Sequence, residues 1–572
     1  MTEFRGNKTA DKYTRGGLLK NKNLGAGESS GSASSTAGGM TAGAIFAYIL
    51  LLLLLIIFFA ILLGFAIANY TKTKDISNEV TPCPNTTLEV NVRRMTIGNN
   101  GTLGTTTVLR FGRLPGDTVK HGTQRMFITE QDGRIFYTEP GYPSGGALTL
   151  LLDLTPFTSV LNEFYSEFGV VGFELHPNFT NNGRFFVYYT ADALNASSSN
   201  LCLSYAQMRG SDGLNLIYDP DVYTAALLLE EWNKPDNTAS TAVFVKRWLT
   251  LKQAYDRDVG IDNLRFDPVS GGLLVVIGDG GCFYDPFNFA QNTAFLTGKI
   301  LRVEVDPAAS STVANNCTSE VATFSELFLA CPDTRQLVTI YASGVRNGGY
   351  ISVDTFNGIS NYYFAQVGQS FYESVYRIKP GDNFGWFIRE ALECTCILDD
   401  PTKDGLCGNY SQTIPDCVAN GIAMNASFHN GDFLKPIAIT SHQIDRTTAI
   451  IGGYVYRGDT LGCQFEGNYI FGDWSQHDTT TASGPAIPAT FSGVFTLWMI
   501  RPSIDGTQVA NPYSKGRIQV NPSGLVGEKN YLTSIGYDID QNRMFIATSG
   551  LVAPYSEPAV PSTLGRIYEL VN

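Results

Sequence analysis

A chain of 572 residues has room for several ordinary domains or for one large β assembly, and it can bury a substantial core. Its contents of 44% apolar and 16% charged residues are those of a folded protein rather than a disordered one. The 58 glycines and the 12% aromatic residues favour many short strands joined by tight turns over long helices. We therefore expect an all-β body.

The first 42 residues have too little apolar surface to fold. Residues 24–42 read LGAGESSGSASSTAGGMTA, a tract of small and polar residues that is typical of a flexible segment. Six basic residues in 1–42 outnumber three acidic ones, and cationic flanks of a membrane segment stay in the cytosol. We predict a disordered cytosolic tail over residues 1–42.

An uncharged segment follows, GAIFAYILLLLLLIIFFAILLGFAIA from Gly43 to Ala68. A helix of about 20 apolar residues spans a bilayer core. The alternative is a cleaved secretory signal, because Ala66-Ile67-Ala68 resembles a cleavage site, but the apolar run is too long for that. We predict a transmembrane signal anchor over residues 43–69, a linker over 70–87, and an extracellular or lumenal body over 88–572.

The cysteines and the charge of the body agree with this topology. All ten cysteines follow the apolar segment, as expected in an oxidising compartment. We predict a local disulfide between Cys317 and Cys331, and further disulfides in a cysteine-rich insertion at about 391–420, at Cys394, Cys396, Cys407 and Cys417. Zinc is disfavoured there because no histidine lies between the first and last of these four. Outside the tail, 50 acidic residues face 34 basic ones, which argues against nucleic acid as a partner.

Sequons for N-glycosylation recur along the part of the chain that follows the apolar segment. They support the same topology, and their predicted acceptor residues are Asn85, Asn100, Asn178, Asn195, Asn316, Asn409 and Asn425.

From about residue 88 onward a short β-branched or aromatic strand, a Gly/Asp/Asn turn and another strand recur. Examples are RMFITEQDGRIFYTEP (125–140), GGLLVVIGDGG (271–281), GNYIFGDW (467–474) and GVFTLWMI (493–500). Strand pairs over more than four hundred residues without alternating helices favour a β-propeller over a sandwich or a parallel sheet. The final strand GRIYELVN (565–572) is expected to close the ring against an early strand.

Several motifs together resemble one family, that of the glucose/sorbosone dehydrogenases. They are FGVVGFELHPNFTNNGRFFVYYTA (168–191), IGDGG (277–281), AQNTAFLTGKILRVEVD (290–306), YASGVRN (341–347), VGQSFYESVYRIKPGDNFGW (367–386) and IIGGYVYRG (450–458). The family includes soluble quinoprotein sugar dehydrogenases and hedgehog-interacting-protein-like ectodomains, and the chain is closest in character to the latter. The resemblance implies a six-bladed propeller with a ligand face at one end of its central channel.

The resemblance also implies what catalysis would need. The enzymes hold pyrroloquinoline quinone (PQQ) over calcium, and a histidine takes the proton of the sugar hydroxyl. The corresponding position here is Val259 or a neighbour, and no residue from Arg257 to Ile261 is a histidine. The cation positions of the enzymes fall near Ser475, Tyr531 and Thr533, which are uncharged. We therefore predict no catalytic residue, and PQQ is disfavoured as a cofactor.

Other family positions are retained, and each has a structural as well as a ligand-binding interpretation. Asp279 either binds a ligand or calcium or accepts bonds from turn amides. Arg346 either contacts a ligand or pairs with a buried carboxylate across blades. The candidate ligand or cofactor residues are Glu167, Asp279, Arg346, Asn347, Gly368 and Gln369, with Asp279 as the candidate calcium ligand. Gly368 also fits a tight turn, and Glu167 could line the channel mouth or complete a calcium shell.

Relocation of the base to another histidine is disfavoured. His176 lies in HPNF, where a histidine usually braces a turn, and His442 precedes a strand; the remaining histidines are His121, His429 and His477. The sequence thus predicts a membrane-anchored β-propeller that binds an extracellular protein or glycan or serves as a surface component. The alternative is a PQQ- and calcium-dependent aldose dehydrogenase that oxidises a sugar hydroxyl by hydride transfer.

Overall fold

The computed structural model covers the whole chain, which divides into two units, Met1–Pro82 and Cys83–Asn572. The residues that it describes all belong to the second unit. They are 87–97, 103–158, 167–193, 223–238, 241–254, 258–281, 285, 288–306, 316–369, 371–396, 405–408, 433–476, 492–502, 511–527, 529–550 and 565–572, with 394–396 and 405–408 described by backbone only. The predicted tail, transmembrane segment and most of the linker therefore lie outside the described residues. No helix among the described residues has the length and apolar content needed to cross a bilayer.

Four sheets have four strands each, and neighbouring strands in them are antiparallel. The first contains β2 (Thr106–Gly112), β3 (Arg125–Glu130), β4 (Arg134–Thr138) and β5 (Leu148–Asp153). The second contains β6 (Val170–Leu175), β7 (Arg184–Asp192), β8 (Ala225–Asn233) and β9 (Val243–Gln253). The third contains β10 (Leu264–Phe266), β11 (Leu273–Ile277), β12 (Lys299–Val303) and β13 (Val338–Ser343). The fourth contains β14 (Asn347–Phe356), β15 (Ile359–Val367), β16 (Tyr372–Ile378) and β20 (Ala438–Ser441).

A larger sheet has eight strands, in the order β21-β22-β23-β24-β1-β27-β26-β25. They are β21 (Ile450–Val455), β22 (Tyr469–Asp473), β23 (Thr496–Ile500), β24 (Gly516–Val520), β1 (Glu89–Arg94), β27 (Gly565–Val571), β26 (Arg543–Ser549) and β25 (Tyr531–Asp538). The pair β1 and β24 is parallel, whereas the other neighbouring strands of this sheet are antiparallel. The predicted closure is confirmed, because the C-terminal strand β27 pairs with the early strand β1.

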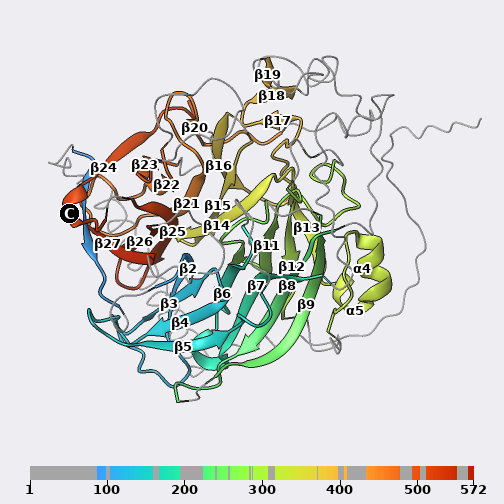
Figure 1. Cartoon of the computed structure of the whole chain (residues 1–572), viewed down its shortest axis with the longest axis horizontal. Helices are drawn as coiled ribbons and strands as arrows, with labels where there is room; N and C mark the ends of the chain where they lie inside the picture. Colours follow the sequence, from blue (N-terminus) through green and yellow to red (C-terminus); the bar gives the residue numbers. More distant parts are fainter. Residues whose placement is uncertain are drawn as a thin grey trace, which may run out of the picture. The chain divides into compact units, whose positions relative to one another are not determined.

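The sheets fan out from a common centre, so the fold is an all-β propeller (Figure 1). We call six strands the inner strands. They are β2, β6, β10 and β14, which are the first strands of the four-stranded sheets, and β21 and β25, which form the two edges of the eight-stranded sheet. Each inner strand contacts the next, and β25 contacts β2, so that the contacts form a closed cycle. The strands with recurring motifs in the sequence have equivalent places: RMFIT in β3 and RMFIAT in β26 are each the neighbour of an inner strand.

The inner strands are largely buried on both faces because each sheet packs between its neighbours, as in β6 and β25, whereas the outer strand β1 alternates between exposed and buried residues. All five residues of β11 are buried, which explains the uninterrupted run LLVVI between glycine turns. One core cluster joins the second and third sheets through side chains such as Phe186, Leu229 and Leu273. Another joins the fourth sheet to the eight-stranded one, where the rings of Tyr363 and Tyr469 stack with centroids 5.0 Å apart.

The remaining elements are short and lie outside the main sheets. They are α2 (Phe179–Asn182), α4 (Phe324–Ala330), α5 (Pro332–Arg335), the 3₁₀ turn η4 (Pro522–Gly524), and a three-stranded sheet of β17 (Arg389–Glu390), β18 (Glu393–Cys396) and β19 (Gly405–Gly408). The last sheet falls in the cysteine-rich segment. Cys394 and Cys396 of β18 pair through the backbone with Gly408 and Gly405 of β19, which also holds Cys407, and Cys417 lies outside the described residues.

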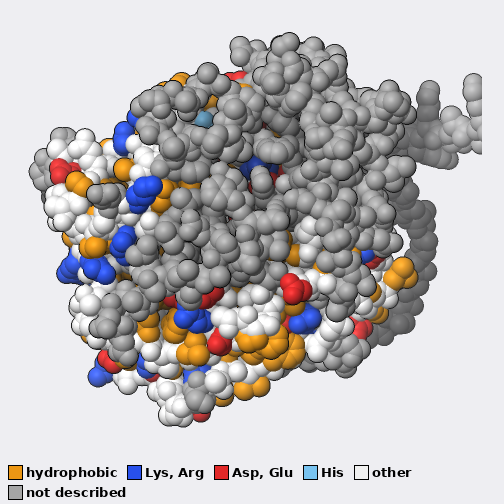
Figure 2. Space-filling view, viewed as in Figure 1, with side chains coloured by type: hydrophobic (Ala, Val, Ile, Leu, Met, Phe, Trp, Pro, Cys, Tyr) orange, Lys and Arg blue, Asp and Glu red, His pale blue; other side chains and the backbone are white. Residues whose placement is uncertain are grey.

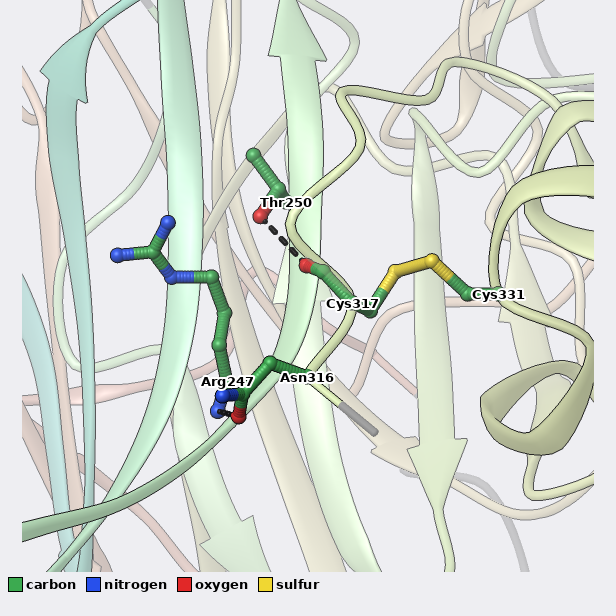
Figure 3. Close-up of a disulfide and its surroundings, with 5 residues drawn as sticks. All are labelled: Arg247, Thr250, Asn316, Cys317 and Cys331. Carbon is green, nitrogen blue, oxygen red and sulfur yellow. Dashed lines mark hydrogen bonds between the residues drawn. A yellow bond between two sulfur atoms is a disulfide. The ribbon is translucent and has the colours of Figure 1, made fainter. Parts of the chain in front are cut away.

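The predicted disulfide between Cys317 and Cys331 is present and ties the segment before α4 to the end of that helix (Figure 3). The segment is also held against β9, where the Thr250 hydroxyl donates to the Cys317 carbonyl at 2.8 Å. On the same strand the Arg247 amide donates to Asn316 Oδ1 at 2.9 Å. Cys463 is disulfide-bonded as well. The four predicted cysteines of the insertion have no described side chains, so their pairing stays a prediction.

Candidate functional site

The candidate residues gather where the inner strands begin. Glu167 lies just before β6, Gly260 before β10, and Arg346 directly before β14. Asp279 follows the buried strand β11, and Gln369 follows β15. Because the starts of neighbouring inner strands meet at one end of the cycle, residues far apart in the sequence come together there. Hydrogen bonds connect most of them, as follows.

Glu167 links two neighbouring sheets. Its Oε1 accepts from Asn347 Nδ2 at 2.8 Å, and its Oε2 accepts from the Gly260 amide at 3.1 Å. Gly260 has φ of +76°, and a Cβ there would lie 1.1 Å from the Gly348 carbonyl oxygen, so this close approach requires glycine. Burial, and after it the charge of Asp258, raises the pKa of the Glu167 carboxyl to about 7.

Arg346 is held by groups from several sides. Its Nη2 lies 3.3 Å from Asp258 Oδ2, its Nε donates to Gln369 Oε1 at 3.2 Å, and its Nη1 donates to the Val367 carbonyl at 3.1 Å. Its guanidinium also lies over the ring of Trp386, 5.8 Å from the centroid. The structure thus places this arginine in the ion pair across sheets that was one of its two interpretations.

Asp279 is almost fully buried, with 1% of its surface exposed. Its Oδ1 accepts from the Gly281 amide at 2.9 Å, and its Oδ2 accepts from Trp386 Nε1 at 2.7 Å. Burial, followed by the charges of Asp258 and Asp285, raises the pKa of this carboxyl well above its ordinary value. Asp279 therefore braces its own turn and anchors an indole, and both of its oxygens already accept a hydrogen bond.

Gly368 is a position of close backbone approach, which agrees with the tight-turn interpretation. A Cβ there would lie 1.8 Å from the Tyr372 carbonyl oxygen, and the Gly368 amide lies 3.3 Å from both carboxylate oxygens of Glu373. Glu373 is buried and also accepts from the Ile450 amide at 2.9 Å. His442 Nε2 lies 2.7 Å from Glu373 Oε1, which gives this histidine a structural partner.

Asp258 was not among the predicted residues. Its charge nevertheless raises the pKa of both Glu167 and Asp279, and its carboxylate pairs with Arg346. It is buried and has φ of +54°, a conformation that aspartate adopts more readily than most residues. The only signal in the sequence was that Asp258 directly precedes Val259, the expected base position. Trp386 was missed for a different reason: its indole reaches Asp279 across 107 residues of sequence.

Lys299 and Asp285 are two further buried charged residues, and Asp285 acts electrostatically on Asp279. The Lys299 ammonium donates to the carbonyls of Phe289 at 2.6 Å and Thr297 at 2.9 Å. Burial lowers its pKa to about 7. Asp285 accepts from the amides of Phe289 and Ala290, both at 2.8 Å, and burial raises its pKa to about 6. This lysine is fully buried, and its ammonium donates to backbone carbonyls.

The positions at which the quinoprotein chemistry would be expected do not fit that cofactor. Val259 is fully buried in the core cluster that joins the second and third sheets. Ser475 is fully buried and accepts from the Gly493 amide at 3.0 Å. Tyr531 is fully buried against Trp474, with ring centroids 4.9 Å apart. These groups can neither take a proton from a sugar nor neutralise the carboxylates of PQQ.

The described histidines do not replace the missing base. His176 Nδ1 accepts from the Asn178 amide at 3.0 Å, and its Nε2 lies 2.8 Å from Asp306 Oδ2, so it braces the turn after β6 as expected for HPNF. His121 has a 78% exposed side chain, far from the inner strands' starting ends. His429 and His477 lie outside the described residues.

Metal binding at this end has no preformed centre within the part of the chain that the structure describes. No group of three or more His, Cys, Asp or Glu side chains there is placed to hold a metal ion. The oxygens of Glu167 and Asp279 accept from protein donors, as given above. Calcium at Asp279 stays a prediction, and its test is given below.

Two predicted glycosylation sites can be located. Asn178 precedes α2 and Asn316 precedes the disulfide, and both are exposed. The other predicted sites, Asn85, Asn100, Asn195, Asn409 and Asn425, lie outside the described residues. On the described part of the face in Figure 2, Lys and Arg side chains are interspersed with acidic and apolar ones.

Comparison with known proteins agrees with the resemblance seen in the motifs. The chain is 29% identical to the HIPL1 protein of Arabidopsis thaliana over 404 residues, which is 65% of this chain and 53% of that protein. It is also 29% identical to the HIPL2 protein of the same plant over 380 residues, 62% of this chain and 49% of that protein. The expected resemblance to hedgehog-interacting-protein-like chains is confirmed, although the chain spans about half the length of these relatives. No protein-family model matches the chain.

Solved structures with a similar fold include two aldose sugar dehydrogenases. The PQQ-bound form of the Streptomyces coelicolor enzyme is 17% identical, has a TM-score of 0.45, and the match covers 84% of this chain and 98% of that one. The apo-form of the soluble Escherichia coli enzyme is 14% identical with a TM-score of 0.44, and covers 84% and 99%. With TM-scores below 0.5, these structures do not bear on the chemistry of individual residues here.

Proposed function

We propose that this chain is a membrane-anchored β-propeller that binds an extracellular protein or a glycan and does not oxidise sugars. One observation carries the proposal: the position where the family resemblance expects the proton acceptor is Val259, a fully buried core side chain. The positions expected to carry cations are also uncharged and buried, as at Ser475 and Tyr531. An oxidoreductase of this kind needs both a base and anchored quinone carboxylates.

The polar groups at the starting ends of the inner strands favour a ligand with donor or cationic groups. Carboxylates of Glu167, Asp258 and Asp279 surround a single guanidinium, that of Arg346, which is already paired. Burial, and after it the charge of Asp258, raises the pKa of both Glu167 and Asp279. A cofactor that carries several carboxylates would meet repulsion here, whereas a basic peptide side chain or an amino sugar would gain from the same groups.

We further infer that the propeller has six blades. The count follows when the eight-stranded sheet is divided at its parallel pair, β1 with β24, into two runs of four strands. Together with the four separate four-stranded sheets, these runs match the closed cycle of inner strands. Rigid blades with loops gathered at both ends are a scaffold well suited to recognition.

The anchoring and the compartment are part of the same proposal. The uncharged segment over residues 43–69, with its basic flank, supports an anchor with a cytosolic N-terminus. The disulfide between Cys317 and Cys331 supports an oxidising compartment, extracellular or lumenal, for the body. Exposed Asn178 and Asn316 are then available for glycosylation.

The test is an assay for the rival activity on the full chain purified in detergent. The protein is incubated with PQQ, calcium and a panel of aldoses, and reduction of an artificial electron-acceptor dye is followed; quinone binding is measured separately by the change in PQQ absorbance. We expect neither turnover nor quinone binding, with a quinoprotein aldose dehydrogenase as the positive control. Sugar-dependent dye reduction would overturn the proposal in favour of the PQQ- and calcium-dependent dehydrogenase.

A further inference from the structure

A hollow lies at the other ends of the inner strands, away from the candidate site. It is a cavity of about 320 Å³ to which every inner strand contributes: Arg110 from β2, Glu174 from β6, Arg265 from β10, Val353 from β14, Tyr454 from β21 and Tyr537 from β25. Asn347 begins β14 in the candidate site, and Val353 lies six residues further along the same strand. At a rise of about 3.3 Å per residue, the two sites are about 20 Å apart.

The charged groups on the floor of this cavity neutralise one another. Arg110 Nε donates to Glu174 Oε2 at 2.8 Å, and the same guanidinium makes a two-point ion pair with Asp262. Arg265 Nη1 lies 3.1 Å from the same oxygen of Glu174, and Arg265 Nε donates to the Ile351 carbonyl at 3.0 Å. Two guanidinium groups thus face two carboxylates, and the floor is electrically balanced.

The charged groups at the rim are also matched. Arg113 Nη2 lies 2.7 Å from Asp540 Oδ2. His176 is held between Asp306 and the Asn178 amide. No charged side chain in the described lining is therefore left without a counter-charge or a backbone partner, and an ionic ligand would have to displace an existing pair.

The uncommitted groups of the lining are neutral. The Tyr454 hydroxyl accepts from Arg265 Nη2 at 2.7 Å and from Arg110 Nη1 at 3.4 Å, and no described residue accepts its own proton, which is left to donate. The side chains of Gln124 and Thr180 make no hydrogen bond to any described residue. Aromatic and aliphatic side chains lie between these polar groups, among them those of Phe111, Leu175, Phe179, Tyr537 and Ile539.

We propose that this cavity binds a neutral, polyhydroxylated ligand of one or two sugar rings. Its volume falls at the small end of the range of about 300–1,000 Å³ that small-molecule sites occupy. A sugar offers hydroxyl donors and acceptors to Tyr454 and Gln124, and its apolar ring face suits the tyrosine rings. The site is distinct from the candidate site at the opposite mouth and does not depend on the function proposed for it.

The experiment uses the full chain in detergent and two classes of probe. Glucose, maltose and myo-inositol are neutral probes, and glucose 6-phosphate and glucuronate are charged ones; binding is measured by saturation-transfer NMR and by calorimetry. Two variants remove one neutral group each, Tyr454→Phe and Gln124→Leu. The matched control is Gln519→Leu, which makes the same change at an exposed position of β24 that does not line the cavity.

We expect at least one neutral probe to bind, the charged analogues to bind more weakly, and each cavity variant to weaken binding by about fivefold, the effect of one lost hydrogen bond. Gln519→Leu should leave the affinity unchanged. Thermal unfolding reports whether Tyr454→Phe disturbs the fold. If it does, the affinity of Gln124→Leu, a substitution at the rim, still tests the proposal. Preference for a charged probe, binding that neither variant weakens, or no binding of any neutral probe would each overturn the proposal.

Discussion

Arg110 offers a direct test of how the inner strands are held together. It is 4% exposed and joins three sheets: it stands on β2, pairs with Glu174 on β6, and pairs with Asp262 just before β10. It also donates to the carbonyls of Leu109 at 3.0 Å and Leu264 at 3.2 Å. In Arg110→Ala, Glu174 keeps Arg265 as a partner, whereas Asp262 keeps only a distant contact of 4.0 Å with that arginine.

The cost of Arg110→Ala therefore comes mainly from a stranded carboxylate. Asp262 is 3% exposed, and removal of one partner of a buried pair costs about 3–5 kcal/mol of the free energy of unfolding. The control is Arg113→Ala, three residues along, whose partner Asp540 is more exposed; a pair of that kind contributes about 0–1 kcal/mol. Urea unfolding of the full chain gives both values from the shift in midpoint.

A double variant separates the stranded charge from simple loss of packing. Asp262→Asn removes the charge at nearly the same size, and asparagine tolerates the φ of +60° at this position. If the stranded carboxylate causes the cost, Arg110→Ala with Asp262→Asn will be more stable than Arg110→Ala alone. Equal costs for Arg110→Ala and Arg113→Ala, or purely additive effects in the double variant, would refute this reasoning.

Three further predictions concern pH, the disulfide and calcium. Because the folded pKa of Glu167 is about 7 against an ordinary 4.5, the folded chain keeps a proton between these values that the unfolded chain has lost, so stability falls as pH rises through this window. Glu167→Gln should remove that contribution, up to about 1.4 kcal/mol per pH unit, seen as a flatter urea midpoint against pH than in the unsubstituted chain. The double variant Cys317→Ala with Cys331→Ala opens a loop of 14 residues and should cost about 3 kcal/mol, measured under non-reducing conditions; an unchanged midpoint would contradict it. If Asp279 helps to hold calcium, chelation with EGTA should lower Tm, by the equivalent of about 2.7 kcal/mol when calcium had been present at 100 times its Kd, and an indifferent Tm removes calcium from the proposal.

The sequence predicted the local elements well because their causes are local. The glycine-flanked apolar run Leu273–Ile277 is a buried strand, and the terminal strand closes the sheet as expected. The pair Cys317 and Cys331 was predictable because the two residues are close in sequence. In each of these cases the determining residues lie within a short stretch or at the chain's end.

The partners of the candidate residues could not be predicted, because they lie far away in the sequence. Arg346 meets Asp258 from another sheet, and Asp279 meets Trp386 across 107 residues, so no spacing in the sequence signals either contact. The cavity at the other ends of the inner strands is an extreme case, because each of the six inner strands supplies at least one residue to its lining. Arg110 and Asp262, for example, are 152 residues apart. Only the closed cycle of strands brings such residues into one lining.

Replacement of the expected base by Val259 has a consequence for the fold as well as for chemistry. A fully buried valine contributes about 1.5–3 kcal/mol through burial, and a histidine at the same place would have to be desolvated among apolar neighbours. The surroundings would favour its neutral form, and the nearby guanidinium of Arg346 is already paired with Asp258. We therefore expect Val259→His to destabilise the core without producing sugar-dependent dye reduction.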